Sequence, residues 1–588
     1  MIGIPDFSTS EVLVLANRIF GRAGVVRPLP SYKDQNFWIE AESGKGVVLK
    51  IVNAGEPLEV IRLQQMAMQQ AVQAGIPCPE MITTLSGENW GRAMKNGVHY
   101  WIWCMSHMPG RPIATLRYHN KKLLFDWGRT LGALDKALES LDVAFINQNT
   151  EWNLSNAASV ITDKLVYVAD IHIREWIEQV LKQYSAIPEE VWAGLRQSTI
   201  HNDANDHNFL VNPSGFSAMG GGQISAVLDF GDMVKAHTIN ELAIATAYAC
   251  LDKEHPIQVI GEVAKGYHSV NPLSETELSV LFVLVCMRLS VSICMAAKEQ
   301  ALRPQDAYIG VSQGPIRRTI PRLAAINMKT ATAVLRVACG YSASPKQSQI
   351  KAYLATQITQ TRRVPVVSGL ESEDALVIDL GVDSPLVAGD PIQNVAAVLG
   401  SRIVTEMEKH NKQVAVGRYN EPRLLYNAPF FKTGTRLTDE SRTIHLGMDF
   451  FAPVGTMVFA PLAGTIHAFA FNPLPQDYGG VVLLKHLTPE GEDFYTLYGH
   501  LSRASLLDKK VGQEVRSGDP LGELGSEAEN VGWPPHLHFQ VMVDDLGLGT
   551  DFPGVALASE RNVWTELSPD PNEICGIASR CFPPEKPS

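Results

Sequence analysis

The chain lacks an excess of basic residues and contains few cysteines. Each of these two facts excludes some classes of protein. Its 588 residues carry a formal net charge of -12, so no basic face for nucleic-acid phosphates is expected. None of the eight cysteines forms a CxxC pair, which argues against thiolate zinc sites and against a disulfide framework. Reduced and mostly buried thiols are expected instead.

A secretion signal and a long uninterrupted apolar run are also missing from the sequence. Residues 1–20 contain no basic region followed by an apolar run and a cleavage site, so we expect no export signal. The most apolar stretch, residues 278–297, is divided by Arg288 into runs too short to cross a bilayer. We therefore expect a buried helix there, and neither a membrane nor a nucleic acid as partner.

The chain is too long for one hydrophobic core, and its patterning changes along its length. Residues 25–52 alternate polar and apolar side chains as antiparallel strands do, and a helical pattern follows that ends at Gly75. The pattern stays mostly helical from about residue 111 to residue 340. Short apolar runs separated by Gly, Pro and Asp then predict many short strands in the last part of the chain.

These patterns predict an α+β multidomain protein, with a bilobal N-terminal domain followed by an all-β domain. The expected boundaries are a β-rich lobe at 1–108, a helical lobe at 109–340, a linker region at 341–395, the all-β domain at 396–560 and a C-terminal tail at 561–588.

One polar segment, TIHNDANDHNFLV, enters an apolar strand and has the spacing of a phosphoryl-transfer loop. His201, Asp203 and Asn208 match H-x-D-x-x-x-x-N, in which the carboxylate orients or deprotonates the attacking hydroxyl. VLDFGD supplies Asp229 as a second metal-binding carboxylate, and Lys50 in VVLKIV occupies a strand position suited to a phosphate-contacting lysine. Each motif alone is equally typical of a polar loop, but their combination favours phosphoryl transfer.

The acidic partner of the strand lysine stays open at this point. Glu59 lies on the following helix, while Gln64 or Gln65 holds the place where a glutamate is expected. The segment SYKDQNF, residues 31–37, is the candidate for a loop that covers the phosphates, although it lacks the Gly-rich pattern.

Two features argue against a protein kinase. Asn202 stands where a protein kinase carries the arginine that reads an activation-loop phosphate. A helical pattern also begins within about ten residues of Asp229, and there is no A-P-E motif, which leaves little room for a peptide-docking segment. A small-molecule acceptor is therefore expected.

The segments HNDANDHNFLV and VLDFGDM resemble the aminoglycoside phosphotransferase/choline kinase family, and within it the hydroxylysine kinase-like branch, over roughly residues 10–330. The resemblance implies a protein-kinase-like bilobal fold that uses ATP and Mg²⁺. It implies Asp203 as catalytic base, Asn208 and Asp229 as magnesium ligands, Lys50 as a nucleotide contact, and His201 as a brace of the loop.

The same resemblance implies that the acceptor is an amino alcohol, such as hydroxylysine, ethanolamine or a choline-like compound. Asp206, Asp232 and Glu241 lie close in sequence to the loop, and one of them is the candidate partner of the ammonium group. Solvated or helix-capping roles fit each of these carboxylates equally well. An aminoglycoside acceptor is the alternative.

A second group of polar residues lies in the predicted all-β domain. His445 precedes Asp449 by four residues in TIHLGMDFFAP, His500 lies in LYGHLS, and PPHLHFQV contributes His536 and His538. Residues two apart in a strand share a face, so the last two histidines can point into one groove. Three N/O ligands with one open position are typical of catalytic zinc.

This domain resembles the lysostaphin-type zinc endopeptidases over about residues 400–545. The resemblance implies His445, Asp449 and His538 as Zn²⁺ ligands, with His500 and His536 as the pair that activates water and stabilises the transition state. Two alternatives stay open: a peptidoglycan-type endopeptidase with a regulatory kinase-like domain, and a zinc domain that serves only as a structural module.

Because the first domain needs ATP, a cytoplasmic location is expected, although endopeptidases of this type generally act outside the cytoplasm. In fused relatives of this architecture a class III, pyridoxal-phosphate-dependent aminotransferase-like domain follows. This sequence ends at LSPDPNEICGIASRCFPPEKPS, about where that domain would begin. A separate pyridoxal-phosphate-dependent phospho-lyase or aminotransferase is therefore the expected partner.

Overall fold

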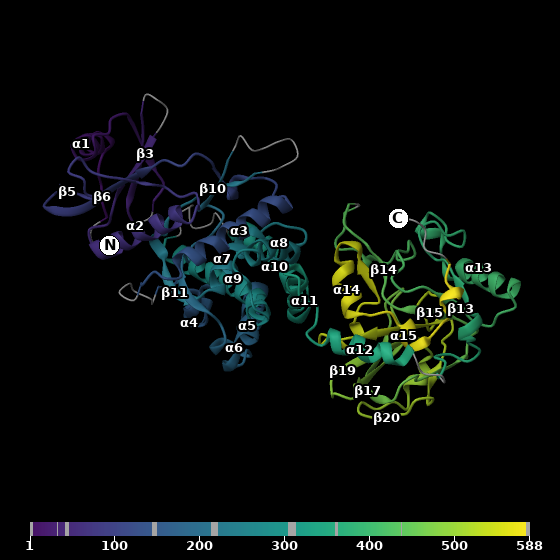
Figure 1. Cartoon of the computed structure of the whole chain (residues 1–588). Helices are drawn as coiled ribbons and strands as arrows, with labels where there is room; N and C mark the ends of the chain where they lie inside the picture. Colours follow the sequence, from purple (N-terminus) through teal and green to yellow (C-terminus); the bar gives the residue numbers. More distant parts are fainter. Residues whose placement is uncertain are drawn as a thin grey trace. The chain divides into compact units, whose positions relative to one another are not determined.

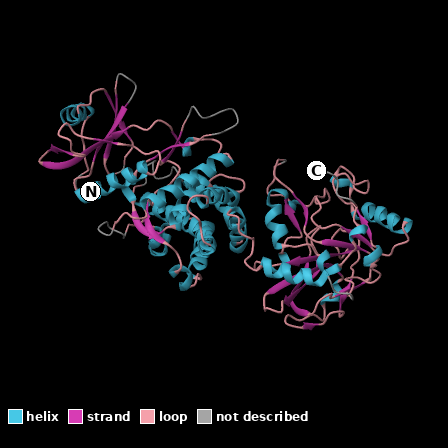
Figure 2. Cartoon of the chain, in the orientation of Figure 1, coloured by secondary structure: helices cyan, strands magenta, loops and turns pink. Residues whose placement is uncertain are grey.

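The computed structural model of the chain describes residues 4–31, 33–41, 46–143, 150–212, 222–303, 313–358, 363–436 and 438–583. The chain divides into two compact units, Met1–Cys339 and Gly340–Ser588 (Figure 1). We describe each unit by itself. Strands gather in the first part of the first unit and in the second unit, and helices make up most of the remainder (Figure 2).

The first unit begins with an antiparallel sheet, as the alternation at residues 25–52 predicts. Its strands are β1 (Val25–Leu29), β2 (Gln35–Glu40), β3 (Gly46–Ile51), β4 (Met81–Ile82), β5 (Gly91–Lys95) and β6 (Val98–Ser106), in the order β1-β2-β3-β6-β4, with β5 also paired to β6. Helix α1 (Thr9–Phe20) begins at a capping box formed by Ser8 and Glu11 and packs its apolar side chains on this sheet. Helix α2 (Leu58–Gln73) follows β3.

The rest of the first unit is mainly helical and carries five short strands around the H-x-D segment. The helices are α3 (Lys121–Leu138), α4 (Ala157–Lys164), α5 (Ile171–Ser185), α6 (Glu189–Ala193), α7 (Ile239–Ala249), α8 (Pro256–His268), α9 (Glu275–Leu302), α10 (Gln313–Ala324) and α11 (Met328–Ala338). The strands are β7 (Arg111–Pro112), β8 (Gln197–Ile200), β9 (Phe209–Val211), β10 (Ile224–Val227) and β11 (Val234–His237), in two small sheets, β10-β9-β7 and β11-β8.

Helix α9 contains the most apolar stretch of the sequence and lies at the centre of this helical lobe. By length and composition alone it could cross a membrane, but 89% of its most apolar window is buried inside the unit. It contacts α4, α5, α7, α10 and α11. The expectation of a buried helix therefore agrees with its packing.

The second unit is built on an eight-stranded sheet in the order β12-β13-β15-β22-β19-β18-β17-β20. These strands are β12 (Leu376–Ile378), β13 (Ala415–Gly417), β15 (Met448–Phe451), β17 (Gly464–Asn472), β18 (Gly479–Leu487), β19 (Asp493–Leu501), β20 (Glu514–Val515) and β22 (His536–Met542). Two separate antiparallel pairs complete it: β14 (Arg442–His445) with β23 (Val555–Leu557), and β16 (Met457–Phe459) with β21 (Pro520–Glu523).

Helices also belong to the second unit, beside the predicted strands. They are α12 (Gln347–Ile358), α13 (Ala396–Lys409), α14 (Arg561–Leu567) and α15 (Asn572–Cys575). Ile350 and Leu354 of α12 and Ile574 of α15 lie in the same core as the sheet. The segments expected as a linker and as a tail thus contribute apolar side chains to the core of this unit. All eight cysteines are free, and all but Cys581 are buried.

Candidate active sites

The H-x-D segment forms the turn between β8 and β9, and its histidine braces it. The fully buried His201 ring donates from Nε2 to the Leu228 carbonyl oxygen over 2.8 Å. Its Nδ1 therefore accepts the backbone N–H of Asp203 at 3.3 Å. The edge-to-face contact with Phe230, at 5.0 Å between centroids, fixes the ring further. The arrangement holds the backbone of Asp203 in place.

The carboxylate of Asp203 is held by amide side chains from its own loop. Asn208 donates to its Oδ2 and Asn205 to its Oδ1, both over 2.8 Å. With its nitrogen engaged, Asn208 has its amide oxygen left for a cation. The Asp203 side chain keeps 25% of its surface exposed, so a substrate can reach it.

A buried arginine that the motif did not indicate also points at Asp203. Arg288 lies in the middle of α9 with 2% exposure, and its Nη2 donates to Asp203 Oδ1 at 3.4 Å. It also donates to the Trp152 carbonyl at 3.2 Å and lies over the Trp152 ring. The sequence feature that points to Arg288 is its position within an apolar helix, since a buried charge there needs a partner.

Burial raises the pKa of Asp203 to about 7, against the opposing effect of the Arg288 guanidinium, and the charge of Asp232 adds to the rise. A carboxyl group with a pKa near neutrality is suited to accept a proton from a hydroxyl.

Glu241 has a structural role in the loop, so its prediction as a possible partner of the substrate ammonium group was wrong. It is fully buried, and its Oε2 accepts the backbone N–H of Asn202 at 2.7 Å. Asn202 has a left-handed backbone with φ 66°, so this bond stabilises a conformation that few residues adopt. Asp206 and Asp232 are only partly buried and stay candidates for an ammonium partner.

The buried strand lysine Lys50 pairs with Asp34, which corrects the sequence-based candidates. Its Nζ lies 2.9 Å from Oδ2 of Asp34, the residue directly before β2. Burial acts to lower the pKa of Lys50, but the carboxylates of Asp229 and Asp34 raise it above its ordinary value. Lys50 is thus charged and within electrostatic reach of Asp229.

The residues earlier named as possible partners lie elsewhere. Glu59 is exposed on α2, whereas Gln64 and Gln65 are buried, and Gln65 donates to the Asn89 carbonyl at 3.3 Å. Asp34 falls inside the SYKDQNF segment, the candidate for the loop that covers the phosphates; Tyr32 of that segment lies outside the described residues. Asp229 itself is exposed and left-handed, with φ 60°.

In the second unit, strand alternation places two of the predicted metal ligands, Asp449 and His538, on one face of the eight-stranded sheet. His538 of β22 pairs directly with Asp449 of β15, and the neighbouring pair, Leu537 with Phe450, lies in the core on the other face. His536 therefore shares the face of His538. The His538 ring lies close to Gly447, where a Cβ would lie 2.7 Å from the ring.

His445 of β14 joins the two ligands of the sheet, and the three ligand atoms form a nearly equilateral triangle, the metal triad of His445, Asp449 and His538. His445 Nε2 lies 3.0 Å from His538 Nδ1 and 3.1 Å from Asp449 Oδ1, and His538 Nδ1 lies 3.1 Å from the same oxygen. Zinc bonds of about 2.0–2.1 Å in tetrahedral geometry require ligand atoms roughly 3.3 Å apart. The triangle therefore fits a zinc-sized cation and leaves one face for a fourth ligand.

Hydrogen bonds behind the ligands fix which nitrogen faces the triangle. His445 donates from Nδ1 to the Arg418 carbonyl at 2.9 Å, and His538 donates from Nε2 to Gln540 Oε1 at 2.9 Å. Burial lowers the pKa of His445 to about 4, so its ring is neutral at neutral pH. Neutral imidazoles held by a second partner are what metal binding requires.

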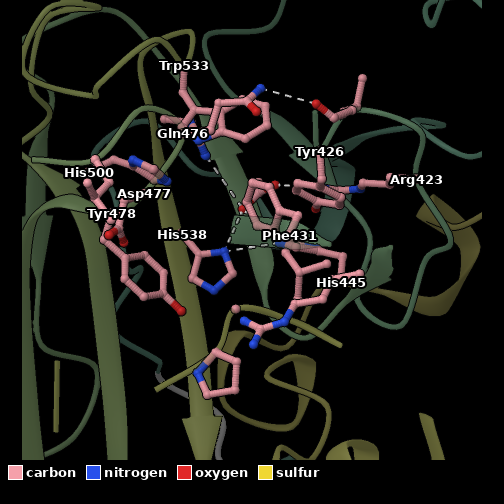
Figure 3. Close-up of a pocket in the computed structure, with 18 of the residues that line it drawn as sticks. Arg423, Tyr426, Phe431, His445, Gln476, Asp477, Tyr478, His500, Trp533 and His538 are labelled. Carbon is pink, nitrogen blue, oxygen red and sulfur yellow. Dashed lines mark hydrogen bonds and ion pairs between the residues drawn. The ribbon is translucent and has the colours of Figure 1, made fainter. Parts of the chain in front are cut away.

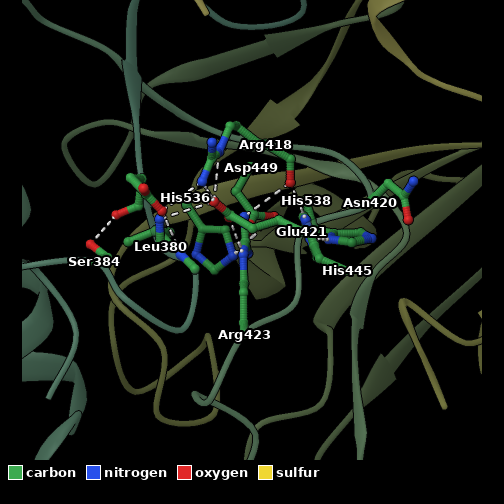
Figure 4. A network of polar contacts seen from close by, with 12 residues as sticks. Leu380, Ser384, Arg418, Asn420, Glu421, Arg423, His445, Asp449, His536 and His538 are labelled. Carbon is green, nitrogen blue, oxygen red and sulfur yellow. Dashed lines mark hydrogen bonds and ion pairs between the residues drawn. The ribbon is translucent and has the colours of Figure 1, made fainter. Parts of the chain in front are cut away.

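A buried network of acids and arginines supports the aspartate of the triad (Figure 4). Arg423 donates to Asp449 Oδ2 at 2.6 Å and to Glu421 Oε2 at 2.7 Å. Arg418 joins Glu421 to Asp379 on the outer side. Burial acts to raise the pKa of Asp449, but His445 and Arg423 hold it well below its ordinary value.

A cavity of about 240 Å³, the metal cavity, opens beside the triad and is lined by His500 and His536. Figure 3 shows His538 between His445 on one side and Tyr478 on the other, with the aromatic rings of Tyr426, Phe431 and Trp533 nearby. The rings of His500 and His536 lie 4.1 Å apart between centroids. The five polar residues of the second motif thus meet at one cavity.

The two histidines outside the triad are held differently. His536 donates from Nδ1 to the Pro534 carbonyl at 2.7 Å, so its Nε2, 3.7 Å from Asp449 Oδ1, is the acceptor atom. His500 has a left-handed backbone with φ 68°, and its buried Nδ1 has no hydrogen-bond partner within the described part of the chain. An unpaired buried nitrogen at a cavity wall is available to a ligand or a water molecule.

Comparison with known proteins identifies both halves. Residues 25–278 match the phosphotransferase enzyme family. Hydroxylysine kinase of Mus musculus is 34% identical over 329 residues, which cover 51% of this chain and 85% of that protein. The chain belongs to the phosphotransferase enzyme family. It contains a small-molecule kinase domain, as the sequence predicted, on a kinase-like fold.

The second half matches peptidase family M23 over residues 443–548. The peptidoglycan DD-endopeptidase ShyC of Vibrio cholerae is 32% identical over 102 residues, which cover 17% of this chain and 21% of that protein. This chain thus spans about a fifth of that relative's length. Among solved structures, an amicoumacin kinase complex covers 54% of this chain and 94% of its own, at 14% identity and a TM-score of 0.40.

Proposed function

We propose that the first unit phosphorylates a hydroxyl group with Asp203 as the catalytic base. The observation that carries this proposal is the placement of the Asp203 carboxylate, which Asn205, Asn208 and Arg288 hold while part of it stays exposed. Its Oδ2 and Oδ1 each accept a hydrogen bond, which orients the carboxylate before the acceptor arrives. Asp203 then positions the acceptor hydroxyl and takes its proton.

The same site has groups suited to hold ATP and Mg²⁺. Asn208 through its amide oxygen and Asp229 through its carboxylate are the proposed magnesium ligands, and Lys50 is the proposed contact of the nucleotide phosphates. When bound, the metal neutralises charge on the phosphates. The 2.9 Å ion pair with Asp34 fixes the orientation of the Lys50 ammonium group.

The proposed acceptor is an amino alcohol, with hydroxylysine as the first candidate. Support comes from the 34% identity to a hydroxylysine kinase across most of that protein. Asp206 and Asp232 remain as carboxylates near the loop that can pair with an ammonium group. Ethanolamine and choline-like compounds are the next candidates, and an aminoglycoside is the alternative acceptor.

A coupled ATP assay tests this proposal. Hydroxylysine, ethanolamine, choline, homoserine and an aminoglycoside are compared with the wild type and Asp203→Asn. Hydroxylysine turnover that Asp203→Asn removes and His500→Ala preserves supports the proposal. Preference for the aminoglycoside would reassign the acceptor class, and turnover that survives Asp203→Asn would exclude Asp203 as base.

We also propose that the second unit is a zinc-dependent hydrolase, supported by the fit of the metal triad. His445, Asp449 and His538 are the proposed Zn²⁺ ligands. When bound, zinc acts as a Lewis acid toward a carbonyl group. His536 Nε2 and His500 Nδ1 face the cavity as proton carriers for the water and the developing oxyanion.

Hydrolysis of Gly- and D-Ala-containing peptides by the zinc-loaded full chain tests this second function. Zinc binding without any hydrolysis favours the structural-module alternative. Hydrolysis without ATP turnover on any amino alcohol favours the peptidoglycan-type endopeptidase with a regulatory kinase-like domain.

The location and the partner enzyme follow from the kinase reaction. We propose a cytoplasmic location, because ATP is available there, and cell fractionation tests it. The phosphorylated amino alcohol would be consumed by a separate pyridoxal-phosphate-dependent phospho-lyase or aminotransferase. Disappearance of the purified phosphorylated product in an extract that depends on pyridoxal phosphate tests that step.

A further inference from the structure

A β-bulge turns Arg442 toward the same side of its strand as the metal ligand His445. Residues three apart in a regular strand point to opposite faces. Here, however, Arg442 pairs with Leu557 and His445 pairs with Val555, so one extra residue of β14 is left between them. Leu557 and Val555 are two apart and share a face. Arg442 and His445 opposite them therefore share a face as well.

The guanidinium of Arg442 lines the metal cavity without a salt-bridge or hydrogen-bond partner among the described residues. The other arginine of the cavity, Arg423, is fully engaged by Asp449 and Glu421. Burial lowers the pKa of Arg442 below its ordinary value, and Glu560 and Tyr478 offset this only in part. The Glu560 carboxylate accepts the Trp564 indole N–H at 3.0 Å and forms no ion pair with Arg442. A half-buried cation without a direct ion pair is available to an anion.

The carboxylates of the cavity do not provide that counter-ion. Asp449 belongs to the metal triad, and Asp477 accepts the Tyr478 backbone N–H at 2.7 Å and contacts Asn472. Burial raises the pKa of Asp477, which weakens it further as a partner. Asp551 is exposed at the lining. Within the described cavity wall, Arg442 is thus the cation left for a ligand.

We propose that Arg442 binds a carboxylate group of the peptide substrate beside the metal triad. The proposal rests on the hydrolase function proposed above and specifies its substrate class: a peptide with a carboxylate close to the bond that is cut. That carboxylate is either the chain terminus or an acidic side chain. A planar guanidinium donates two parallel N–H bonds to either kind of carboxylate.

Calorimetric titration of the full chain with short blocked peptides tests this site. The probes are N-acetylglycylglycine, its C-terminal amide, and N-acetylaspartic acid α-amide, whose only carboxylate is in the side chain. The variants are Arg442→Gln, Arg442→Lys and, as matched control, Arg516→Gln, an exposed arginine of the same unit. Each protein is titrated with zinc and after chelator treatment, and its folding is checked by circular dichroism.

The wild type and Arg516→Gln should bind the better of the two acids roughly tenfold or more tightly than the amide, as a charge-assisted bidentate contact implies. Arg442→Gln should remove the preference, and Arg442→Lys should restore part of it. The stronger binder of the two acids identifies the source of the carboxylate. Equal binding of acid and amide by the wild type overturns the proposal, as does a preference that Arg442→Gln retains.

The metal and the arginine can be separated in this experiment. A preference that needs zinc and is unchanged in Arg442→Gln means that the carboxylate sits on the metal, which contradicts the role of Arg442. Absence of zinc from the protein, with an Arg442-dependent preference intact, contradicts the hydrolase function and leaves the carboxylate site standing.

Discussion

Arg423 donates to Oδ2 of Asp449 over 2.6 Å, while Oδ1 of the same carboxylate lies 3.1 Å from both His445 Nε2 and His538 Nδ1. The two carboxylate oxygens of Asp449 therefore have different roles. One is neutralised by a buried guanidinium, and the other faces the position of the metal. This division fixes the carboxylate as a one-oxygen ligand and keeps it ionised.

The first prediction concerns this support of the metal site. Arg423→Gln should lower zinc affinity about 10–100-fold, because partners behind metal ligands contribute on that scale. Competition with a chromogenic chelator measures the affinity. Arg516→Gln, at the exposed surface, is the control and should bind zinc as the wild type does. Unchanged affinity in Arg423→Gln would show that the ion pair does not orient Asp449.

The metal content itself provides the second prediction. Protein purified without chelator should contain one zinc per chain, and His445→Ala or Asp449→Ala should lose it, because three ligands are the minimum of such a site. His536→Ala should keep the metal and lose hydrolysis. Elemental analysis reads the metal directly, and a wild-type protein without zinc would refute the assignment.

Substitution of the proposed catalytic base is the third prediction. Asp203→Ala should lower the rate of phosphoryl transfer by roughly 10²–10⁴-fold, the usual contribution of a positioned base, with nucleotide binding largely kept. Asp229→Ala should instead weaken binding of the magnesium nucleotide. Single-turnover kinetics and nucleotide titration separate the two effects. A normal transfer rate in Asp203→Ala would remove this residue from the mechanism.

Arg288 is predicted to position the Asp203 carboxylate from the centre of α9. Arg288→Lys keeps the charge but loses the planar fork that spans Asp203 and the Trp152 carbonyl, so kcat should fall about tenfold. Arg288→Met, which also removes the charge, should lower kcat further. The Michaelis constant for ATP should stay near the wild-type value in the lysine variant. A change in that constant alone would indicate general disturbance of the lobe.

The fifth prediction concerns pH and the buried His486 of β18. Its ring bonds the Ala463 carbonyl and the Thr496 hydroxyl, each at 2.7 Å, and burial lowers its pKa to about 4. Between the ordinary His value of 6.5 and about 4, the unfolded chain takes up a proton that the folded chain does not. The stability of this region should therefore fall as pH decreases through that window, by at most about 3 kcal/mol.

Hydrogen exchange of β18 and β19 in the full chain measures this effect from pH 7 to pH 4. His486→Gln cannot titrate in this range, so its opening free energy should depend less on pH, even if it is lower at pH 7. If the opening free energy of the two proteins changed with pH in the same way, other groups, such as the buried His445, would be the cause of the pH dependence.

The local motifs were predictable from the sequence because their chemistry depends on spacing within one turn or strand. His201, Asp203 and Asn208 belong to one loop, and the alternation of His536 and His538 in β22 is a property of any strand. The antiparallel strands at 25–52 followed from the local alternation of side chains. The buried helix around Arg288 followed from an apolar run that this charge divides into pieces too short to cross a bilayer.

Contacts between distant segments were not predictable in this way. Arg288 is 85 residues from Asp203, and Arg423 is 26 residues from Asp449. Arg288 was visible in the sequence as a charge in an apolar run, whereas Arg423 was not singled out, and only the fold shows which carboxylate each arginine reaches. The polar composition of 341–395 likewise concealed α12, because its few apolar residues, Ile350 and Leu354 among them, are buried by the sheet.

The Lys50–Asp34 ion pair has a consequence for control of the kinase domain. In protein kinases the strand lysine pairs with a glutamate on a mobile helix, so movement of that helix switches activity. Here the partner, Asp34, directly precedes β2, the strand that neighbours β3 in the same sheet. A shift of α2 would leave the pair intact. The position of the Lys50 ammonium group is therefore fixed by residues in and next to the sheet. Movement of α2 is not expected to control activity through this ion pair.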